Sequence, residues 1–370
     1  MNLTSLLVLS ATLVCGETAS GPRPATFGVT LDVSGANAVL AAALADTAHA
    51  ADAADAALRN DAVRAMIAKM AKYDSTITSA AFKAAVMRLS RGGDGAPFDL
   101  TRLRADPAST RRMLARLTTD SAIVAQRLAD RLRSFTPDGM NVHATMHVLV
   151  GAAHQNGWVP EGNAADFYVD LGFHGEEVES MTNSASHELF HVVQEMAQPD
   201  LAAQLNDRPT LGVDARERYR ARAILLNLVI EGMASYVGDP SMYQSAGPRL
   251  ARDQATLQRE LNRAGDIFAL FDTILYRAAH DPDAPLETLL RLGFGGSWDQ
   301  TGYYVGYRMS KVIDRYAGRD RLRALVTAPP EDFVMEYIRI ARAHPNDPEI
   351  TPLAPASIAI IETLARHPMS

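Results

Sequence analysis

The stretch from Ser184 to Glu195 reads SASHELFHVVQE and places two histidines, His187 and His191, four residues apart in an apolar run. Its spacing predicts a helix over about 180–197 that Pro199 ends. The residues beside the histidines are apolar on nearly every side, which indicates a buried helix: Leu189, Phe190, Val192, Val193 and Met196. Burying two imidazoles and a carboxylate without partners is costly, and a bound metal ion would remove that cost.

The order His-Glu-x-x-His suits a zinc site. On a helix, His187 and His191 lie on one face with their Cβ atoms about 5–6 Å apart, so both imidazoles can reach one zinc ion at about 2.0–2.1 Å. Glu188 lies about 100° round the helix. From there it can take a proton from a water molecule and later pass it to a leaving amine. The alternative is a pair of core histidines whose hydrogen bonds are satisfied by the protein.

The third ligand decides the class of site. A metzincin needs a glycine three residues and a histidine six residues after the second histidine, and here Gln194 and Ala197 stand there. Glu195 lies too far along the helix axis to complete a tetrahedron with both histidines.

Glu231 is the better candidate for the third ligand, because it is a lone carboxylate in the apolar stretch ILLNLVIEGMASYVGDP (224–240). Gly232 and Ala234 follow it and would let another helix approach closely. Glu217 precedes it by fourteen residues, about 21 Å along a helix, and cannot serve the same metal. The alternative role for Glu231 is a partly buried salt bridge.

HELFH, followed some forty residues later by EGMASYV, resembles the gluzincin zinc metallopeptidases, and more narrowly uncharacterised bacterial zinc-dependent peptidase families with a downstream E-G-x-A. The resemblance covers about 165–240 and extends to 300–320. It implies that His187, His191 and Glu231 bind Zn²⁺ and that Glu188 is the general base. It also implies a zincin-like domain in which ADFYVDLGF (165–173) supplies the edge strand for an extended peptide or protein substrate.

Two features depart from thermolysin-like enzymes. The segment 198–219, between the two ligand-bearing helices, is longer and is expected to loop out. Ser235 stands where those enzymes carry an acidic residue that orients a ligand histidine, a kind of partner that tunes metal affinity by about 10–100-fold.

The stretch TGYYVGYRMSKVIDRYAG (301–318) offers tyrosines that could stabilise the oxyanion formed in peptide hydrolysis. Among Tyr303, Tyr304 and Tyr307, we expect Tyr304 or Tyr307 to act. The alternative is a helix that packs its aromatic side chains in the core.

Several histidines precede the motif. His143 and His147 would lie on one side of a strand, where isolated surface histidines are the simpler interpretation than a second metal site. His174 follows the expected edge strand and is a candidate substrate contact.

The rest of the chain predicts an α+β fold that is predominantly α-helical, with a small sheet in the zincin-like domain and helical regions on both sides. Strands are expected over 140–153 and 165–173. Helical spacing fills 35–134 and recurs at 214–237, 249–277, 302–316, 331–342 and 355–366. The expected divisions are a signal peptide (1–20), an N-terminal helical region (21–135), the catalytic core (136–240) and a C-terminal helical subdomain (241–370).

The apolar start of the chain predicts export to the periplasm or the extracellular space. Cys15 is the single cysteine and a candidate lipid anchor, the one expected link to a membrane. The net charge of −7 and the absence of a basic cluster argue against nucleic-acid binding. The sequence therefore predicts an exported zinc metallopeptidase. The alternatives are a zinc amidohydrolase with a non-peptide substrate and a non-catalytic zinc-containing envelope or binding protein.

Overall fold

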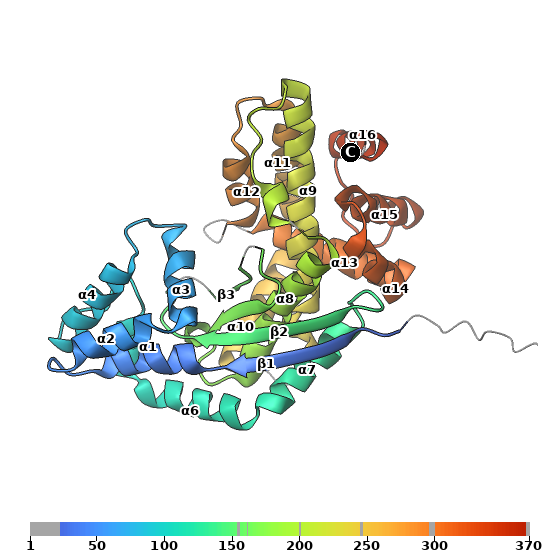
Figure 1. Cartoon of the computed structure of the whole chain (residues 1–370). Coiled ribbons are helices and arrows are strands. Elements are labelled where there is room, and N and C mark those ends of the chain that lie inside the picture. The colour runs from blue at the N-terminus through green and yellow to red at the C-terminus, as the bar shows by residue number, and fades with distance from the viewer. Residues whose placement is uncertain are drawn as a thin grey trace, which may run out of the picture.

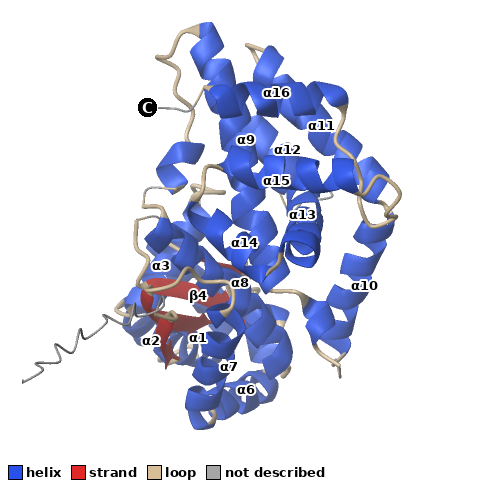
Figure 2. Cartoon of the chain, turned by 90° about the vertical axis from the view of Figure 1, so that its right-hand side faces the viewer, coloured by secondary structure: helices blue, strands red, loops and turns tan. Residues whose placement is uncertain are grey.

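A computed structural model describes residues 23–153, 156–160, 162–199, 201–244, 247–295 and 300–367 of the chain (Figure 1). The expected signal peptide and Cys15 lie outside the described residues. The described part is predominantly helical with one small sheet, which confirms the predicted α+β class. Figure 2 shows the sheet at one end of a body built of helices.

The sheet has four strands in the order β1-β2-β4-β3. β1 (Thr26–Asp32) and β4 (Asp166–Asp170) both run parallel to β2 (Asn141–Leu149). β3 (Gly157–Trp158) pairs antiparallel with β4 and forms the edge nearest the His-Glu-x-x-His helix. The expectation that 165–173 supplies an edge strand is therefore wrong, because β3 lies beyond β4. β1 was not predicted, and it joins the N-terminal part of the chain to the sheet.

The alternation of side chains on β2 explains how the sheet is covered. Val142, Ala144, Met146 and Val148 are buried, while His143 and His147 are on the more accessible face. The helix α8 (Val178–Ala197) packs against β2 and β4. The helix α7 (Ser121–Arg133) packs against both β1 and α8, so the motif helix is in contact with the sheet and with α7.

The helices α9 (Val213–Val237) and α13 (Thr301–Ala317) form the most extensive helix pair of the structure. They touch through two glycines: a Cβ on Gly232 would lie 2.3 Å from Gly306 Cα, and one on Gly306 would lie 2.4 Å from the Leu228 carbonyl oxygen. This confirms the close helix approach that Gly232 predicted. The contact sets the relative positions of Glu231, next to Gly232, and Tyr303, one turn before Gly306.

We expect Gly306→Ala to destabilise the protein by about 3 kcal/mol, because the added methyl group must push two packed backbones apart. Chemical denaturation measures the free energy of unfolding. Gly265→Ala is the matched control, since a Cβ at that helical position meets nothing within 4 Å. The packing account is contradicted if both variants change stability equally.

The other helices cover the sheet and extend the body. The N-terminal part contains α1 (Ser34–Leu44), α2 (Ala50–Leu58), α3 (Asp61–Ala71), α4 (Ser79–Ser90), α5 (Leu100–Ala105) and α6 (Pro107–Thr119). The C-terminal part contains α10 (Pro248–Asn262), α11 (Ala264–His280), α12 (Leu286–Phe294), α14 (Arg319–Ala324), α15 (Pro330–Ala343) and α16 (Pro355–Arg366). The helix expected over 249–277 is divided at Arg263 into α10 and α11. α12 and α14 were not predicted.

The segment Val213–Met242 is long and apolar enough to cross a membrane by length and composition, but 72% of its apolar window is buried inside the protein. Its apolar character is therefore explained by its burial as the central helix α9 of the fold.

Candidate metal centre

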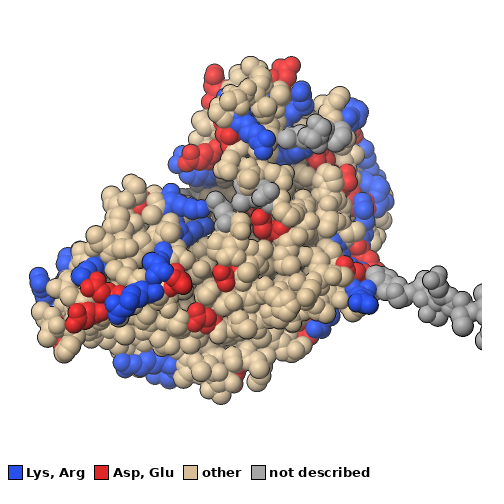
Figure 3. All heavy atoms as spheres, viewed as in Figure 1, with Lys and Arg blue, Asp and Glu red and all other residues tan. Residues whose placement is uncertain are grey.

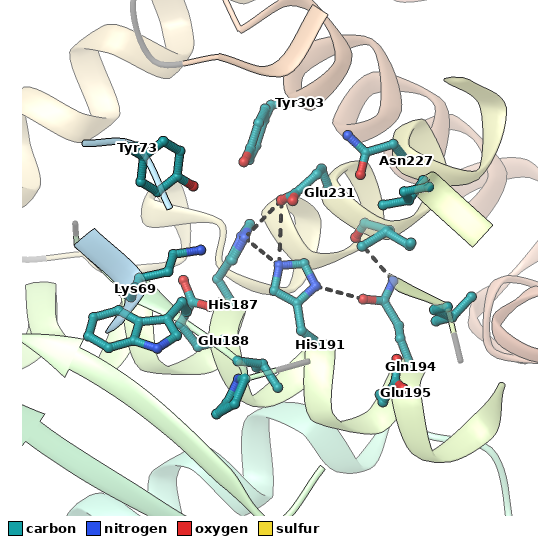
Figure 4. A pocket seen from close by; sticks show the side chains of 17 residues that line it. Lys69, Tyr73, His187, Glu188, His191, Gln194, Glu195, Asn227, Glu231 and Tyr303 are labelled. Atoms are coloured by element: carbon teal, nitrogen blue, oxygen red, sulfur yellow. Dashed lines mark hydrogen bonds and ion pairs between the residues drawn. The ribbon is translucent and has the colours of Figure 1, made fainter. Parts of the chain in front are cut away.

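His187, His191 and Glu231 converge at the junction of α8 and α9 (Figure 4). The two imidazole Nε2 atoms lie 3.0 Å apart, and Glu231 Oε2 lies 3.3 Å from His187 Nε2 and 3.4 Å from His191 Nε2. Three ligand atoms bound tetrahedrally at about 2.0–2.1 Å from zinc would be separated by about 3.3 Å. The triangle therefore has the size that one zinc ion requires.

A second observation supports this fit. Glu231 Oε2 is buried and makes no hydrogen bond of good geometry within the described part of the chain. It faces the two imidazole nitrogens, and such an orphaned carboxylate oxygen is costly unless a cation satisfies it. The three side chains are 16–19% exposed, so the group is enclosed by protein yet open on one side. A ligand set that leaves one side open is typical of a catalytic rather than a structural zinc site.

Gln194 orients His191. Its Oε1 lies 2.9 Å from His191 Nδ1, and its Nε2 donates to the Ile230 carbonyl oxygen of α9. Because an amide oxygen can only accept, the proton of a neutral His191 is on Nδ1, which leaves Nε2 free for a metal. Gln194 therefore supplies an orienting contact of the kind that Ser235 was expected to leave missing. Its signal in the sequence was the spacing of three residues from His191.

Glu188 lies beside the ligand group and under the edge strand. It is 9% exposed, and a Cβ on Gly157 of β3 would come within 2.8 Å of its Oε1. Burial raises the pKa of Glu188 above its ordinary value, while His187, His191 and Lys69 act in the opposite direction. A buried carboxylate with a raised pKa is typical of groups that accept and return protons in catalysis.

The structure brings Tyr303 to the ligand group and places the two expected tyrosines elsewhere. The ring of Tyr303 stacks on His187 with 6.2 Å between centroids, and Tyr303 lines the same cavity as the ligands. Tyr307 instead donates its hydroxyl to Asp239, and Tyr304 packs against the hydrophobic core. Because α13 turns about 100° per residue, neighbouring tyrosines point in different directions.

The cavity above the ligand group has a volume of about 330 Å³. Its walls come from α3, β3 and the residues after it, α8, the segment before α9, α9 itself and α13 (Figure 4). Figure 3 shows the surface hollowed between the part that carries α3 and the part that carries α9. The lining residues are Lys69, Tyr73, Gly157, Trp158, Val159, Pro160, His187, Glu188, His191, Gln194, Glu195, Leu201, Leu205, Asn227, Ile230, Glu231 and Tyr303.

The segment 198–219 behaves only in part as expected. α9 already begins at Val213, so its last residues are helical. The preceding part contains a short 3₁₀ turn (Ala202–Leu205), and Leu201 and Leu205 form a wall of the cavity.

Two further histidines that the structure describes, His147 and His174, have partners of their own outside the ligand group. His147 lies between Asp32 and Asp166, with 3.0 Å from its Nδ1 to Asp32 Oδ2 and 3.1 Å from its Nε2 to Asp166 Oδ1. His174 is buried, and its Nδ1 lies 2.9 Å from Ser180 Oγ. Among the described residues, His187, His191 and Glu231 form the one group of this kind, and it does not include His143 or His147.

The fold and the site define a class of protein: a mainly helical α+β protein in which two helices present a His-His-Glu metal-binding group to an open cavity. The chain belongs to the family described as "Putative zinc dependent peptidase (DUF5700)", whose model matches residues 55–346. No curated protein and no solved structure matches the chain. The family description makes zinc the metal, and the structure contains a group that can hold it.

Proposed function

We propose that the chain is a gluzincin-type zinc metallopeptidase, with His187, His191 and Glu231 as the zinc ligands and Glu188 as the general base. The observation that carries the proposal is the triangle of ligand atoms, 3.0–3.4 Å on each side, with a buried carboxylate next to it at the floor of a cavity.

Each residue near the triangle has a task that its position allows. A bound zinc ion supplies Lewis acidity, which polarises a carbonyl group and makes a water molecule more acidic. Glu188 accepts the proton of the attacking water and returns it to the leaving amine nitrogen. Burial raises the pKa of Glu188 above its ordinary value, and the packing of its side chain against Gly157 holds the carboxylate beside the ligand group. Gln194 keeps His191 in the tautomer that binds through Nε2.

Tyr303 is the donor we propose for the oxyanion, in place of Tyr304 or Tyr307. Burial first, and then Glu231 and Glu188, raise the pKa of its phenol well above the ordinary value, so the hydroxyl keeps its proton. A protonated phenol fixed beside the ligand group can donate to the oxygen on which negative charge develops.

Edge strand β3 provides a place for the substrate backbone. Gly157 and Trp158 pair with β4 on one side, and both residues line the cavity. A peptide bound to the other side of β3 would use main-chain hydrogen bonds and would pass over Glu188, which lies against Gly157. This favours a peptide over a small non-peptide amide as the substrate.

We expect Tyr303→Phe to lower kcat by about 10²–10³-fold with little change in KM, because a donor that acts mainly in the transition state is lost. Steady-state kinetics on a peptide substrate measure both constants. Tyr304→Phe is the matched control on the same helix and should retain activity. Equal losses in the two variants would contradict the assignment.

The proposed function itself is tested by incubating the zinc-loaded chain with a peptide library and identifying the products by mass spectrometry. Cleavage that stops when zinc is chelated and returns when zinc is added supports a metallopeptidase. Hydrolysis of non-peptide amides alone would favour the amidohydrolase alternative. Stoichiometric zinc without any hydrolysis would favour a non-catalytic zinc protein.

A further inference from the structure

The N-terminal helical part contributes a cation to the cavity. Lys69 lies in the last turn of α3 and lines the cavity together with Tyr73. Both residues come from the N-terminal helical part, whereas the metal ligands come from α8 and α9. Figure 4 shows Lys69 extending toward the space above Glu188. Among the described residues that line the cavity, Lys69 is the one lysine or arginine, and the other charged residues there are Glu188, Glu195 and Glu231.

Lys69 has no ion-pair partner among the described residues. The contact of its Nζ is with the ring of Tyr73, 5.5 Å from the centroid, and that tyrosine is 70% exposed. A contact of this kind at an exposed site is weak, and Glu188, with which Lys69 also interacts electrostatically, is not within ion-pair distance of it, so the ammonium group is only weakly held. Its three donors remain available to a ligand that enters the cavity.

The charged residues of the cavity indicate which charge such a ligand should have. With zinc present, Glu188, Glu195 and Glu231 balance the charges of the ion and of Lys69, and among the described lining residues Lys69 is the one basic side chain away from the metal ligands. A cavity of about 330 Å³ is at the small end for ligand sites. It suits a few residues at the end of a peptide better than a long internal segment.

We propose that Lys69 binds a carboxylate of the substrate and so selects peptides that present one close to the bond to be cleaved. The inference rests on the proposed peptidase function and specifies its substrate class. The C-terminal carboxylate of a short peptide suits the small cavity best. An aspartate or glutamate side chain offers the same chemistry, and the test separates the two sources.

The test measures binding to full-length, zinc-loaded Glu188→Gln protein, which holds a peptide without cleaving it. Isothermal titration calorimetry compares acetyl-Ala-Ala-Ala with a free C-terminus, the same peptide as its C-terminal amide, and acetyl-Ala-Asp-Ala amide. We expect a peptide with a carboxylate to bind about 10–100-fold more tightly than the neutral amide, the range for hydrogen bonds to charged groups. A preference for the free C-terminus or for the aspartate identifies the source.

Further substitutions in the Glu188→Gln protein test whether Lys69 causes the carboxylate preference. Lys69→Met should reduce the ratio of the dissociation constants to about one, and Lys69→Arg should largely retain it. Lys72→Met is the matched control, because it removes an equal charge three residues further on, outside the cavity. It should keep the ratio.

The proposal is overturned if Lys69→Met keeps the carboxylate preference, because the carboxylate would then bind to the metal without help from Lys69. It is also overturned if the Glu188→Gln protein with Lys69 intact binds the peptides with a carboxylate and the neutral amide peptide equally tightly, or binds none of them. Parallel cleavage assays with the wild type keep the two claims apart. Cleavage of acid and amide peptides at equal rates refutes the role of Lys69 and leaves the peptidase. A Lys69-dependent preference without cleavage refutes the peptidase and leaves the carboxylate site.

Discussion

Replacing Glu188 by glutamine should reduce peptide hydrolysis by about 10²–10⁴-fold while the protein still binds one zinc ion. Glutamine has the same shape as glutamate but cannot accept the proton of the attacking water. Glu188 is not among the three convergent ligands, so the metal should stay in place. The measurement pairs kcat on a cleavable peptide with the zinc content of the same sample.

Glu195→Gln is the matched control for this variant. Glu195 is two turns further along α8 and lines the same cavity, so its replacement makes an identical chemical change close to the metal. We expect its activity to fall less than tenfold. If Glu188→Gln keeps most of its activity with zinc bound, another group takes the proton and the proposed mechanism is wrong.

Replacing Glu231 by alanine should weaken zinc binding by at least about 100-fold, more than the 10–100-fold typical of residues that only support a ligand. The variant leaves two imidazoles 3.0 Å apart with no carboxylate between the helices. Peptide hydrolysis should be lost together with the metal. Elemental analysis after dialysis against a competing chelator of known affinity measures the change.

Glu217→Ala is the control for Glu231→Ala. Both residues are on α9, but Glu217 is almost four turns earlier and lies outside the cavity. It should keep full zinc content. Retention of zinc by Glu231→Ala would place the third ligand elsewhere and would remove the basis for the gluzincin class.

The motif helix could be predicted from the sequence because a buried apolar helix with two histidines and a glutamate needs a partner for its polar groups. The same reasoning found Glu231, a lone carboxylate in an apolar helix beside Gly232. The structure brings these residues together, and the glycine contact with Gly306 explains how α9 and α13 come so close.

The choice among the tyrosines was not open to sequence reasoning, because it depends on which face of α13 meets α9. The structure shows that α13 meets α9 at Gly306. A helix that packs through Gly306 also turns the residue one turn earlier, Tyr303, toward Glu231. The edge strand was missed for another reason: β3 spans two residues, too few for a period-two pattern to be read.

The parallel pairing of β1 with β2 joins segments 115 residues apart, and no local pattern indicates such a contact. The same holds for Lys69, which sits on an ordinary amphipathic helix and reaches the cavity only through the packing of the N-terminal part. Long-range placement of this kind follows from tertiary packing rather than from propensity.

The central claim is that one zinc ion is bound by His187, His191 and Glu231, and X-ray absorption spectroscopy at the zinc edge tests it most directly. The account predicts one zinc ion per chain with two imidazole nitrogens at about 2.0–2.1 Å and oxygen atoms as the other neighbours. His191→Ala should remove one imidazole from this shell. A spectrum without imidazole, or one that the His191 variant leaves unchanged, would contradict the account.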